Sequence, residues 1–229
     1  MNYRVNATYR SQDGPGDLRE HARKLTSRKV LRFLDAASMA PFVVTAALYR
    51  SDPAADPKDV ALYTVGGWDG DMPDQPFRSD GTADSDALIS QNILEEANPV
   101  NWLRMLSNNA LCQVSISEGF RGPNAHLVGG PDALEQVLAV AAADLWRGAA
   151  KQALIVAYDT DPEHRNHPSG RAPSAAAGLS LVAADEDDAL PALFGLAELE
   201  AASSDSALDV MHSCIASLAA TRPALRGAR

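Results

Sequence analysis

Few side chains in this sequence are of the types that carry out covalent chemistry, and the two cysteines come first among them. Cys112 lies in a segment whose apolar spacing predicts a buried helix, and Cys214 lies in another predicted helix near the end of the chain. A nucleophilic thiolate needs a helix N-terminus or a neighbouring cation to lower its pKa, and the sequence places neither beside these residues. We interpret both cysteines as structural core residues.

The histidines include one pair with the spacing of metal ligands. His164 and His167 are three residues apart and stand near three carboxylates, at Asp159, Asp161 and Glu163. Imidazole and carboxylate groups of this kind can hold zinc. Because the segment is polar and contains prolines, we interpret it as a solvated loop and predict no metal site.

A glycine-rich turn at 66–70, Gly-Gly-Trp-Asp-Gly, follows a predicted strand. It lacks the third glycine and the following helix of a dinucleotide-binding site. The chain also lacks a Gly-x-Ser-x-Gly elbow, a phosphate-binding Gly-x-x-x-x-Gly-Lys loop, a His-Glu-x-x-His pair and a Cys-x-x-Cys pair. We therefore expect no cofactor.

Composition and charge narrow the function further. The chain has 229 residues, of which 46% are hydrophobic and 22% charged, a balance typical of one globular domain with a sizeable core. Its 30 acidic and 20 basic residues give a net charge of −10, which argues against a nucleic-acid-binding protein and against binding to anionic membranes. Two cysteines are too few for a disulfide framework or a four-cysteine zinc site.

The sequence shows no targeting or membrane-spanning segment. The N-terminal residues are polar and lack the apolar core of a signal peptide. The longest mostly apolar run, Met39 to Tyr49, is far shorter than the roughly 20 residues that span a bilayer. We expect a cytoplasmic protein.

The spacing of apolar residues predicts alternating helices and strands. Short apolar runs predict strands at 60–65, 125–128, 153–157, 178–183 and 194–199. Helical spacing predicts helices at 30–50, 85–97, 102–117, 131–148 and 206–220, with Pro41 marking a break or a new first turn in the first of them. We expect a single α/β domain over 1–229, with a sheet covered on both faces and flexible ends at 1–18 and 222–229.

One series of small residues is more specific. Asn98-Pro99, Asn108, Gly122-Pro123 and Gly148, closing on the strand at 153–157, resembles the N-terminal half of a β-ketoacyl synthase, a condensing enzyme with a thiolase-like fold. The resemblance is good over 98–159 and looser over 19–200. It implies one half of an α-β-α layered thiolase-like fold.

The resemblance also points to one position for the nucleophile. In the family the catalytic cysteine comes nine residues after the Gly-Pro glycine and seventeen before the glycine that ends the next helix. Counted from Gly122 and from Gly148, both distances lead to Pro131, which has no thiol. The C-terminal half that supplies the family's histidines and lysine has no counterpart here, because no Gly-Thr-Gly-Thr or Asn-x-x-x-Gly-His segment is present. We therefore expect no catalytic residue and no condensation by this chain alone.

Some ketosynthase relatives without the cysteine act as chain-length factors beside an active enzyme, and the resemblance implies that role here. The partners would be a full-length ketosynthase in a heterodimer and an acyl carrier protein, in fatty-acid or polyketide-type biosynthesis. In the family, the strand after Gly-Pro pairs across the dimer axis. Here that strand would comprise Asn124, Ala125, His126, Leu127 and Val128.

Two further sets of residues follow from the resemblance. The acyl-tunnel candidates are Gly67, Trp68, Asp69, Val100, Trp102 and Leu103. For the two tryptophans, packing in the core or at an interface is the simpler interpretation. The carrier-docking candidates form a basic cluster on an acidic chain and are Arg23, Lys24, Arg28, Lys29 and Arg32. A solvated helix face is the alternative for this cluster.

Three other functions stay open at this stage. The chain could be a homodimer that binds an acyl group or an acyl carrier protein without condensing anything. It could be an enzyme with relocated chemistry at Cys112, His126 or the pair His164 and His167. It could also be an unrelated α/β domain, which a different order of strands would reveal.

Overall fold

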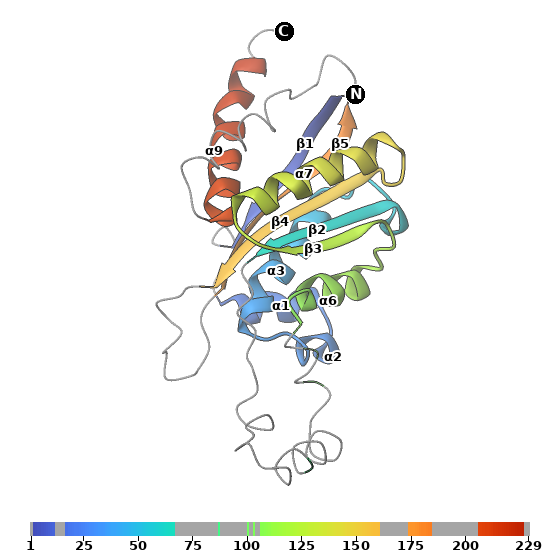
Figure 1. The fold of residues 1–229 in the computed structure, drawn as a ribbon, viewed down its shortest axis with the longest axis vertical. Coiled ribbons are helices and arrows are strands. Elements are labelled where there is room, and N and C mark those ends of the chain that lie inside the picture. Colours follow the sequence, from blue (N-terminus) through green and yellow to red (C-terminus); the bar gives the residue numbers. More distant parts are fainter. Residues whose placement is uncertain are drawn as a thin grey trace.

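Five strands pair into one mixed sheet in the computed structural model, which describes residues 2–11, 17–66, 87, 100, 103, 106–160, 174–184 and 206–226. The strands are β1 (Asn2–Arg10), β2 (Val60–Gly66), β3 (Asn124–Val128), β4 (Gln152–Thr160) and β5 (Ser174–Ala184). Their order across the sheet is β1-β5-β4-β2-β3 (Figure 1). Strand β2 runs parallel to β3 and β4, whereas β5 is antiparallel to both β4 and β1.

Helices cover both faces of this sheet, as the alternation of elements predicts. One face packs against α7 (Pro131–Trp146) and α9 (Ala207–Arg226) through a core that includes Tyr63, Leu134, Ile155 and Met211. The other face packs against α1 (Leu18–Leu25), α3 (Ala36–Ser51) and α6 (Asn109–Glu118) (Figure 1). Strand β2 is buried over its whole length because it lies between two strands and between two helical layers.

The N-terminal segment differs from the sequence-based expectation. Residues 2–10 form strand β1 instead of the start of a flexible 1–18 segment. The register of β1 against β5 shifts between Val5 and Ala7, so an extra residue is inserted there. Tyr3 and Val5 therefore pack toward α7 and α9, while Ala7 and Tyr9 pack on the opposite face with α3. At the other end, α9 continues to Arg226, beyond the expected start of a flexible tail at 222.

The helix boundaries also differ from the prediction in two places. The expected helix at 30–50 is divided into α2 (Arg28–Leu31) and α3, and Pro41 lies inside α3. The division falls at Asp35, whose carboxylate caps α3 by accepting a hydrogen bond from the Ser38 amide at 2.7 Å. Helix α6 begins at Asn109, not at 102.

The remaining predicted elements have different outcomes. The strands predicted at 60–65, 125–128, 153–157 and 178–183 and the helices predicted at 131–148 and 206–220 are confirmed by β2, β3, β4, β5, α7 and α9. The strand at 194–199 and nearly all of the helix at 85–97 lie outside the described residues. Within the part of the chain that is described, no helix has the length and apolar character to cross a membrane.

Candidate functional site

The turn between β3 and α7 contains the position expected for a nucleophile. Gly129 and Gly130 form the turn, and Pro131 is the first residue of α7. The Gly129 amide donates to the Gly66 carbonyl at 3.3 Å, so the turn lies against the carboxyl end of β2. Proline suits the first helical position because the amide hydrogen it lacks has no acceptor within a helix.

This helix N-terminus has the right electrostatics for a thiolate but lacks the thiol. The aligned peptide dipoles of a helix favour negative charge at its first turn, and cysteines placed there have lowered pKa values. Gly130 caps the helix without a side chain, and Pro131 brings no ionisable group. The turn is therefore built where a nucleophile could be activated, while the residue at that place cannot act as one.

Strand β3 lies at the edge of the sheet and is the expected dimer strand. It pairs with β2 alone among the described strands. The Leu62 amide donates to the Pro123 carbonyl at 3.0 Å, and the Gly129 amide donates to the Gly66 carbonyl. The backbone amide and carbonyl groups of the odd-numbered residues in this stretch therefore point toward β2. Successive peptide groups in a parallel strand alternate in direction. The backbone groups of Asn124, His126 and Val128 therefore point away from the sheet.

The His126 side chain lies under this edge, on the face of the sheet where α3 packs. Its Nδ1 is 2.8 Å from the Thr64 hydroxyl, and its ring stacks on Tyr158 at 5.9 Å between centroids. Its Nε2 is buried without a hydrogen-bond partner among the described residues. Burial lowers the pKa of His126, and a hydrogen bond with the Thr64 backbone opposes that shift only in part. The shift favours the neutral imidazole.

Neither cysteine is placed for nucleophilic chemistry. Cys112 is half-buried in α6 and packs against the core on the α3 side of the sheet. Burial raises the pKa of its thiol, which is the opposite of activation. Cys214 is buried in α9 within the other core, and the two cysteines form no disulfide. These positions favour the structural interpretation made from the sequence.

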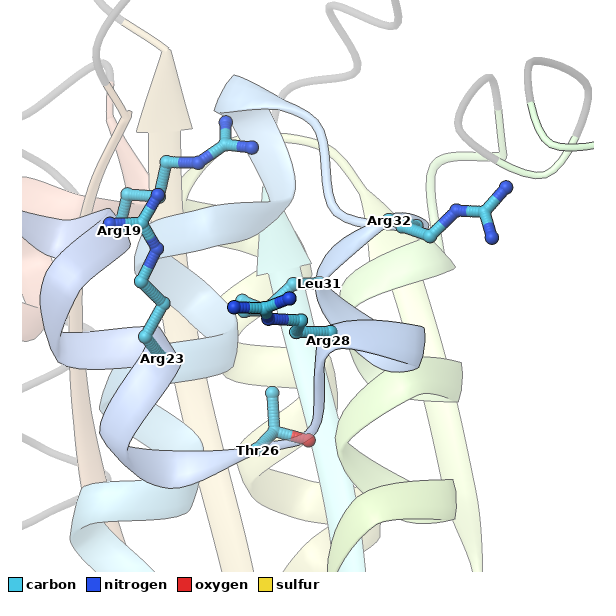
Figure 2. A pocket seen from close by; sticks show the side chains of 6 residues that line it. All are labelled: Arg19, Arg23, Thr26, Arg28, Leu31 and Arg32. Carbon is cyan, nitrogen blue, oxygen red and sulfur yellow. The ribbon is translucent and has the colours of Figure 1, made fainter.

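A basic pocket lies between α1 and α2, on the side of the sheet opposite α7. It has a volume of about 740 Å³ and is lined by Arg19, Arg23, Thr26, Arg28, Leu31 and Arg32. Figure 2 shows Arg19 and Arg23 on α1 and Arg28 reaching toward them from α2, whereas Arg32 points away. The structure thus brings together three of the five residues expected in the basic cluster.

Two residues of that cluster and one unexpected arginine complete the description of the pocket. Lys24 and Lys29 are exposed on the same two helices but do not line the pocket. Arg19 was absent from the sequence-based cluster, although its spacing of four from Arg23 places both on one helix face. That spacing is the signal that could have found it.

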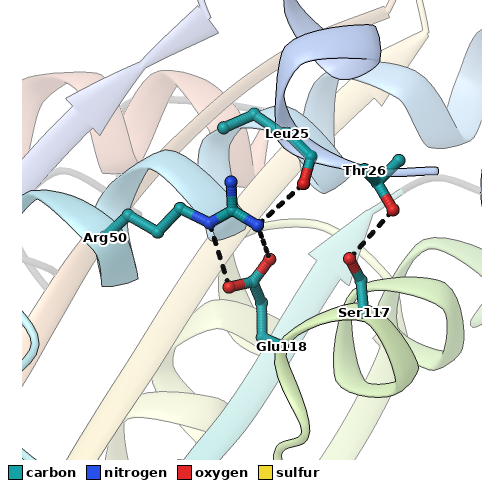
Figure 3. A network of polar contacts seen from close by, with 5 residues as sticks. All are labelled: Leu25, Thr26, Arg50, Ser117 and Glu118. Carbon is teal, nitrogen blue, oxygen red and sulfur yellow. Dashed lines mark hydrogen bonds and ion pairs between the residues drawn. The ribbon is translucent and has the colours of Figure 1, made fainter.

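A network of polar contacts fixes the corner where α1 meets α2 (Figure 3). Arg50 of α3 forms a two-pronged ion pair with Glu118 of α6, with Nη2–Oε1 at 2.7 Å and Nε–Oε2 at 3.1 Å. The same Nη2 donates to the Leu25 carbonyl at 2.7 Å, at the end of α1. Next to it, the Thr26 hydroxyl lies 2.9 Å from the Ser117 hydroxyl. The floor of the pocket is therefore held by two helices other than its own.

The acyl-tunnel candidates are mostly outside the described residues. Gly67, Trp68, Asp69 and Trp102 all lie there, as do His164 and His167. Of the other two tunnel candidates, Val100 is half-buried and Leu103 is exposed, each with helical backbone. Their assignment to a tunnel stays a prediction.

Comparison with known proteins identifies the fold. No family model matches the sequence, and no curated protein sequence matches it significantly. Among solved structures, a chain of the AntDE:AntF assembly, a "type II PKS acyl-carrier protein in complex with its ketosynthase bound to the hexaketide", matches at a TM-score of 0.54 and 16% identity. The match covers 79% of this chain and 62% of that one, so the chain spans less than two thirds of its length.

Two further structures match at lower scores. The ishigamide ketosynthase/chain length factor gives a TM-score of 0.49 at 16% identity, with 77% of this chain and 50% of that chain covered. The ketosynthase ApeO in complex with its chain length factor ApeC, from Xenorhabdus doucetiae, gives 0.48 at 14% identity, with 81% of each chain covered. From the first match, the chain has the thiolase-like α/β fold of ketosynthases.

Proposed function

We propose that this chain is a non-catalytic ketosynthase-like subunit that pairs with an active β-ketoacyl synthase and shapes the acyl tunnel in fatty-acid or polyketide-type biosynthesis. The observation that carries the proposal is Pro131 at the first position of α7. A chain with this fold retains the turn and the helix that would activate a cysteine, yet has no thiol there. Its contribution would then be made through contact with another subunit.

The β3 edge supports pairing with another chain. An edge strand presents unpaired amide and carbonyl groups, which serve as a template for a strand from a partner. Here those groups belong to Asn124, His126 and Val128, and the Val128 side chain is 57% exposed. A partner strand at this edge would bring the turn at Pro131 close to the interface, because that turn follows β3 directly.

We also propose that an acyl carrier protein docks on the basic cluster of α1 and α2. Residues 17–32 contain six basic and two acidic side chains, a local charge of +4 in a chain with a net charge of −10. Local complementarity, and not net charge, steers an acidic partner to its docking surface. The tunnel role of Trp68 and Trp102 belongs to the same proposal.

The test is the native mass of the tagged chain isolated from its source cells, with its partners identified by mass spectrometry. We expect a one-to-one complex with a ketosynthase that carries the catalytic cysteine. Val128→Pro removes one outward amide of β3 without removing a bond to β2, so it should abolish the complex. Val128→Thr keeps the backbone amide and has a side chain of similar shape, so this variant should retain the complex.

Other outcomes of this experiment count against the proposal. A homodimer without a ketosynthase would overturn it in favour of the homodimeric acyl-binding or carrier-binding alternative. A complex that survives Val128→Pro as well as Val128→Thr would show that β3 is not the pairing edge. Thermal unfolding of both variants checks that the free chain remains folded.

A further inference from the structure

We propose that the pocket between α1 and α2 binds a phosphate-bearing group through Arg19, Arg23 and Arg28. This inference goes beyond pairing through β3 and does not depend on it. The phosphate could belong to a free small molecule or to a protein that docks on the same surface, and the experiment below separates these sources.

Three of the arginines that line the pocket carry charges that are not neutralised within the described part of the chain. No ion pair or hydrogen bond there engages the side chains of Arg19, Arg23 or Arg28. The described ion pairs involve Arg50, Arg147 and Lys151 instead. Three guanidinium groups around one hollow repel each other, and a ligand with two or more negative charges relieves that repulsion more than a single carboxylate does.

The type of cation favours phosphate. All the basic residues that line the pocket are arginines, whereas the lysines of the same helices, Lys24 and Lys29, stay outside it. A guanidinium group presents its donors as a planar fork that binds phosphate oxygens in pairs, which a lysine ammonium cannot do. Figure 2 shows Arg23 on α1 and Arg28 on α2, so these two guanidinium groups reach the pocket from different helices.

The size and lining of the pocket favour a group larger than one phosphate ion. Its volume of about 740 Å³ lies in the range of small-molecule sites. Leu31 supplies an apolar wall, and Thr26 lies at the floor with its hydroxyl engaged by Ser117. An organic portion attached to the phosphate would contact Leu31 while the arginines hold the charged end.

The floor of the pocket is fixed in advance. The Leu25 carbonyl and the Thr26 hydroxyl are held by Arg50 and Ser117, which belong to α3 and α6. A binding site whose backbone is already positioned loses less entropy when a ligand arrives. The contacts shown in Figure 3 therefore fix the end of α1 and Thr26, from which the chain enters α2.

The test is isothermal titration calorimetry of the full chain at physiological salt with pyrophosphate, ADP and adenosine as probes. We expect saturable binding of pyrophosphate and ADP and none of adenosine. Arg23→Gln/Arg28→Gln should weaken binding at least tenfold, because it removes two forked contacts. Lys24→Gln/Lys29→Gln removes the same charge from the same helices outside the pocket, so its effect should stay below threefold.

Each contrary result overturns the proposal. Equal losses in the two double variants would mean attraction by net charge alone. Absence of saturable binding by pyrophosphate and ADP, together with binding of a hexaglutamate peptide, would assign the surface to an acidic protein without a phosphate. All probes failing would leave the arginines with no anion to bind and would reject the site.

A further titration distinguishes the two sources of phosphate and the two proposals. Stronger binding of ADP than of pyrophosphate indicates a free small molecule whose organic part contacts Leu31. Stronger binding of pyrophosphate indicates a phosphate that arrives on a docking protein, whose own body supplies the other contacts. Val128→Pro should leave both affinities unchanged, so a failure of pairing through β3 does not affect this result.

Discussion

The corner between α1 and α2 and the edge at β3 are both open to a ligand, but they differ in what they lack. At the corner, the Leu25 carbonyl already accepts a hydrogen bond from Arg50. The charges of the pocket residues Arg19, Arg23 and Arg28 are not paired there by any described residue. At β3 the charge is low and the outward amide and carbonyl groups have no strand beside them among the described residues. The pocket at the corner is therefore suited to bind an anion, whereas the β3 edge is suited to pair with a strand.

The two regions are nevertheless joined by a short stretch of chain. Glu118 ends α6 and fastens the corner, and Gly122 precedes β3 by two residues. Gly119 reverses the chain between them with a φ of +79°, a conformation that glycine adopts without strain. Substitutions on either side of this turn should therefore separate the contributions of the two regions.

The largest effect is expected at the β3 side from Gly122→Ala. A Cβ at this position would overlap the Val60 carbonyl group, whose carbon would lie 2.6 Å away, and a backbone group cannot move aside. We expect a loss of about 3 kcal/mol in the free energy of unfolding, measured by denaturant titration. Gly119→Ala is the matched control, because its Cβ has space and only the positive φ costs energy, about 1 kcal/mol. Equal losses in the two variants would contradict the steric argument.

The next largest effect is expected at the corner from Glu118→Gln. The Glu118 side chain is 7% exposed and that of Arg50 is 41% exposed, so the amide would leave Arg50 without a carboxylate in a partly covered site. We expect a loss of about 1.5 kcal/mol in the free energy of unfolding, the usual value for hydrogen bonds to a charged group. Asp59→Asn, which breaks the exposed ion pair with Lys151, should cost much less. A loss at Asp59 as large as that at Glu118 would show that the corner has no special rigidity.

A smaller effect concerns pH and compares His126 at the β3 edge with His21 near the corner. Burial lowers the pKa of His126, and burial together with Lys24 lowers the pKa of His21. A histidine with a lowered pKa in the folded state takes up its proton more readily when unfolded, so its contribution is complete above the unfolded pKa of about 6.5 and is lost as pH falls below it.

We therefore expect the wild-type melting temperature to fall between pH 7.5 and pH 5.5 and to fall less in His126→Gln. The double variant with His21→Gln should flatten the pH dependence further, since the two histidines lie in different regions and their effects should add. A pH dependence unchanged in His126→Gln would mean that its ring is solvated and not buried at the edge.

The smallest stability effect, and one of opposite sign, is expected from Arg19→Glu. Arg19 and Arg23 are four residues apart on α1, so their like charges destabilise the helix, whereas Glu followed by Arg at this spacing stabilises it by about 0.5 kcal/mol. We expect a slightly raised melting temperature together with loss of pyrophosphate binding. A lowered melting temperature would indicate that Arg19 supports the fold and does not serve a ligand.

The sequence predicts those parts of the fold in which a run of apolar residues coincides with an element that is buried on both faces. Strand β2 contains the apolar run 60–63 and β4 the apolar run 153–158, because both faces of each strand are covered there. Helix α7 begins at a proline and is followed by Gly148 at a φ of +70°. Residues 3–9 alternate apolar and polar side chains, which is the pattern of a strand, but β1 was missed because the segment was interpreted only as polar and mixed in charge. The alternation alone would place Tyr3, Val5, Ala7 and Tyr9 on one face, and it could not predict the register shift after Val5 that moves the last two to the other face.

The same distinction holds for the candidate sites. The basic cluster could be recognised from charge alone, and Pro131 from the family spacing that the resemblance to β-ketoacyl synthases implies. The pocket could not, because it exists only where α1 and α2 meet at Thr26, and that corner is fixed by Ser117 and Glu118, which are distant in sequence. The burial of the His126 Nε2 could likewise not be predicted from the sequence, because it depends on Thr64 and Tyr158, which lie on other strands.

The strand order has a consequence for how the chain acquires its structure during synthesis. Strand β1 is made before the other described strands, yet it pairs with β5, in a register that joins Asn2 to Ala184. Pairing over so long a loop is entropically costly and slow. Until residues 174–184 leave the ribosome, β1 has no place in the sheet, and its apolar residues are open to aggregation. The first strand to be synthesised is thus among the last to pair. Until then, the nascent chain depends on other contacts to cover the apolar residues of β1.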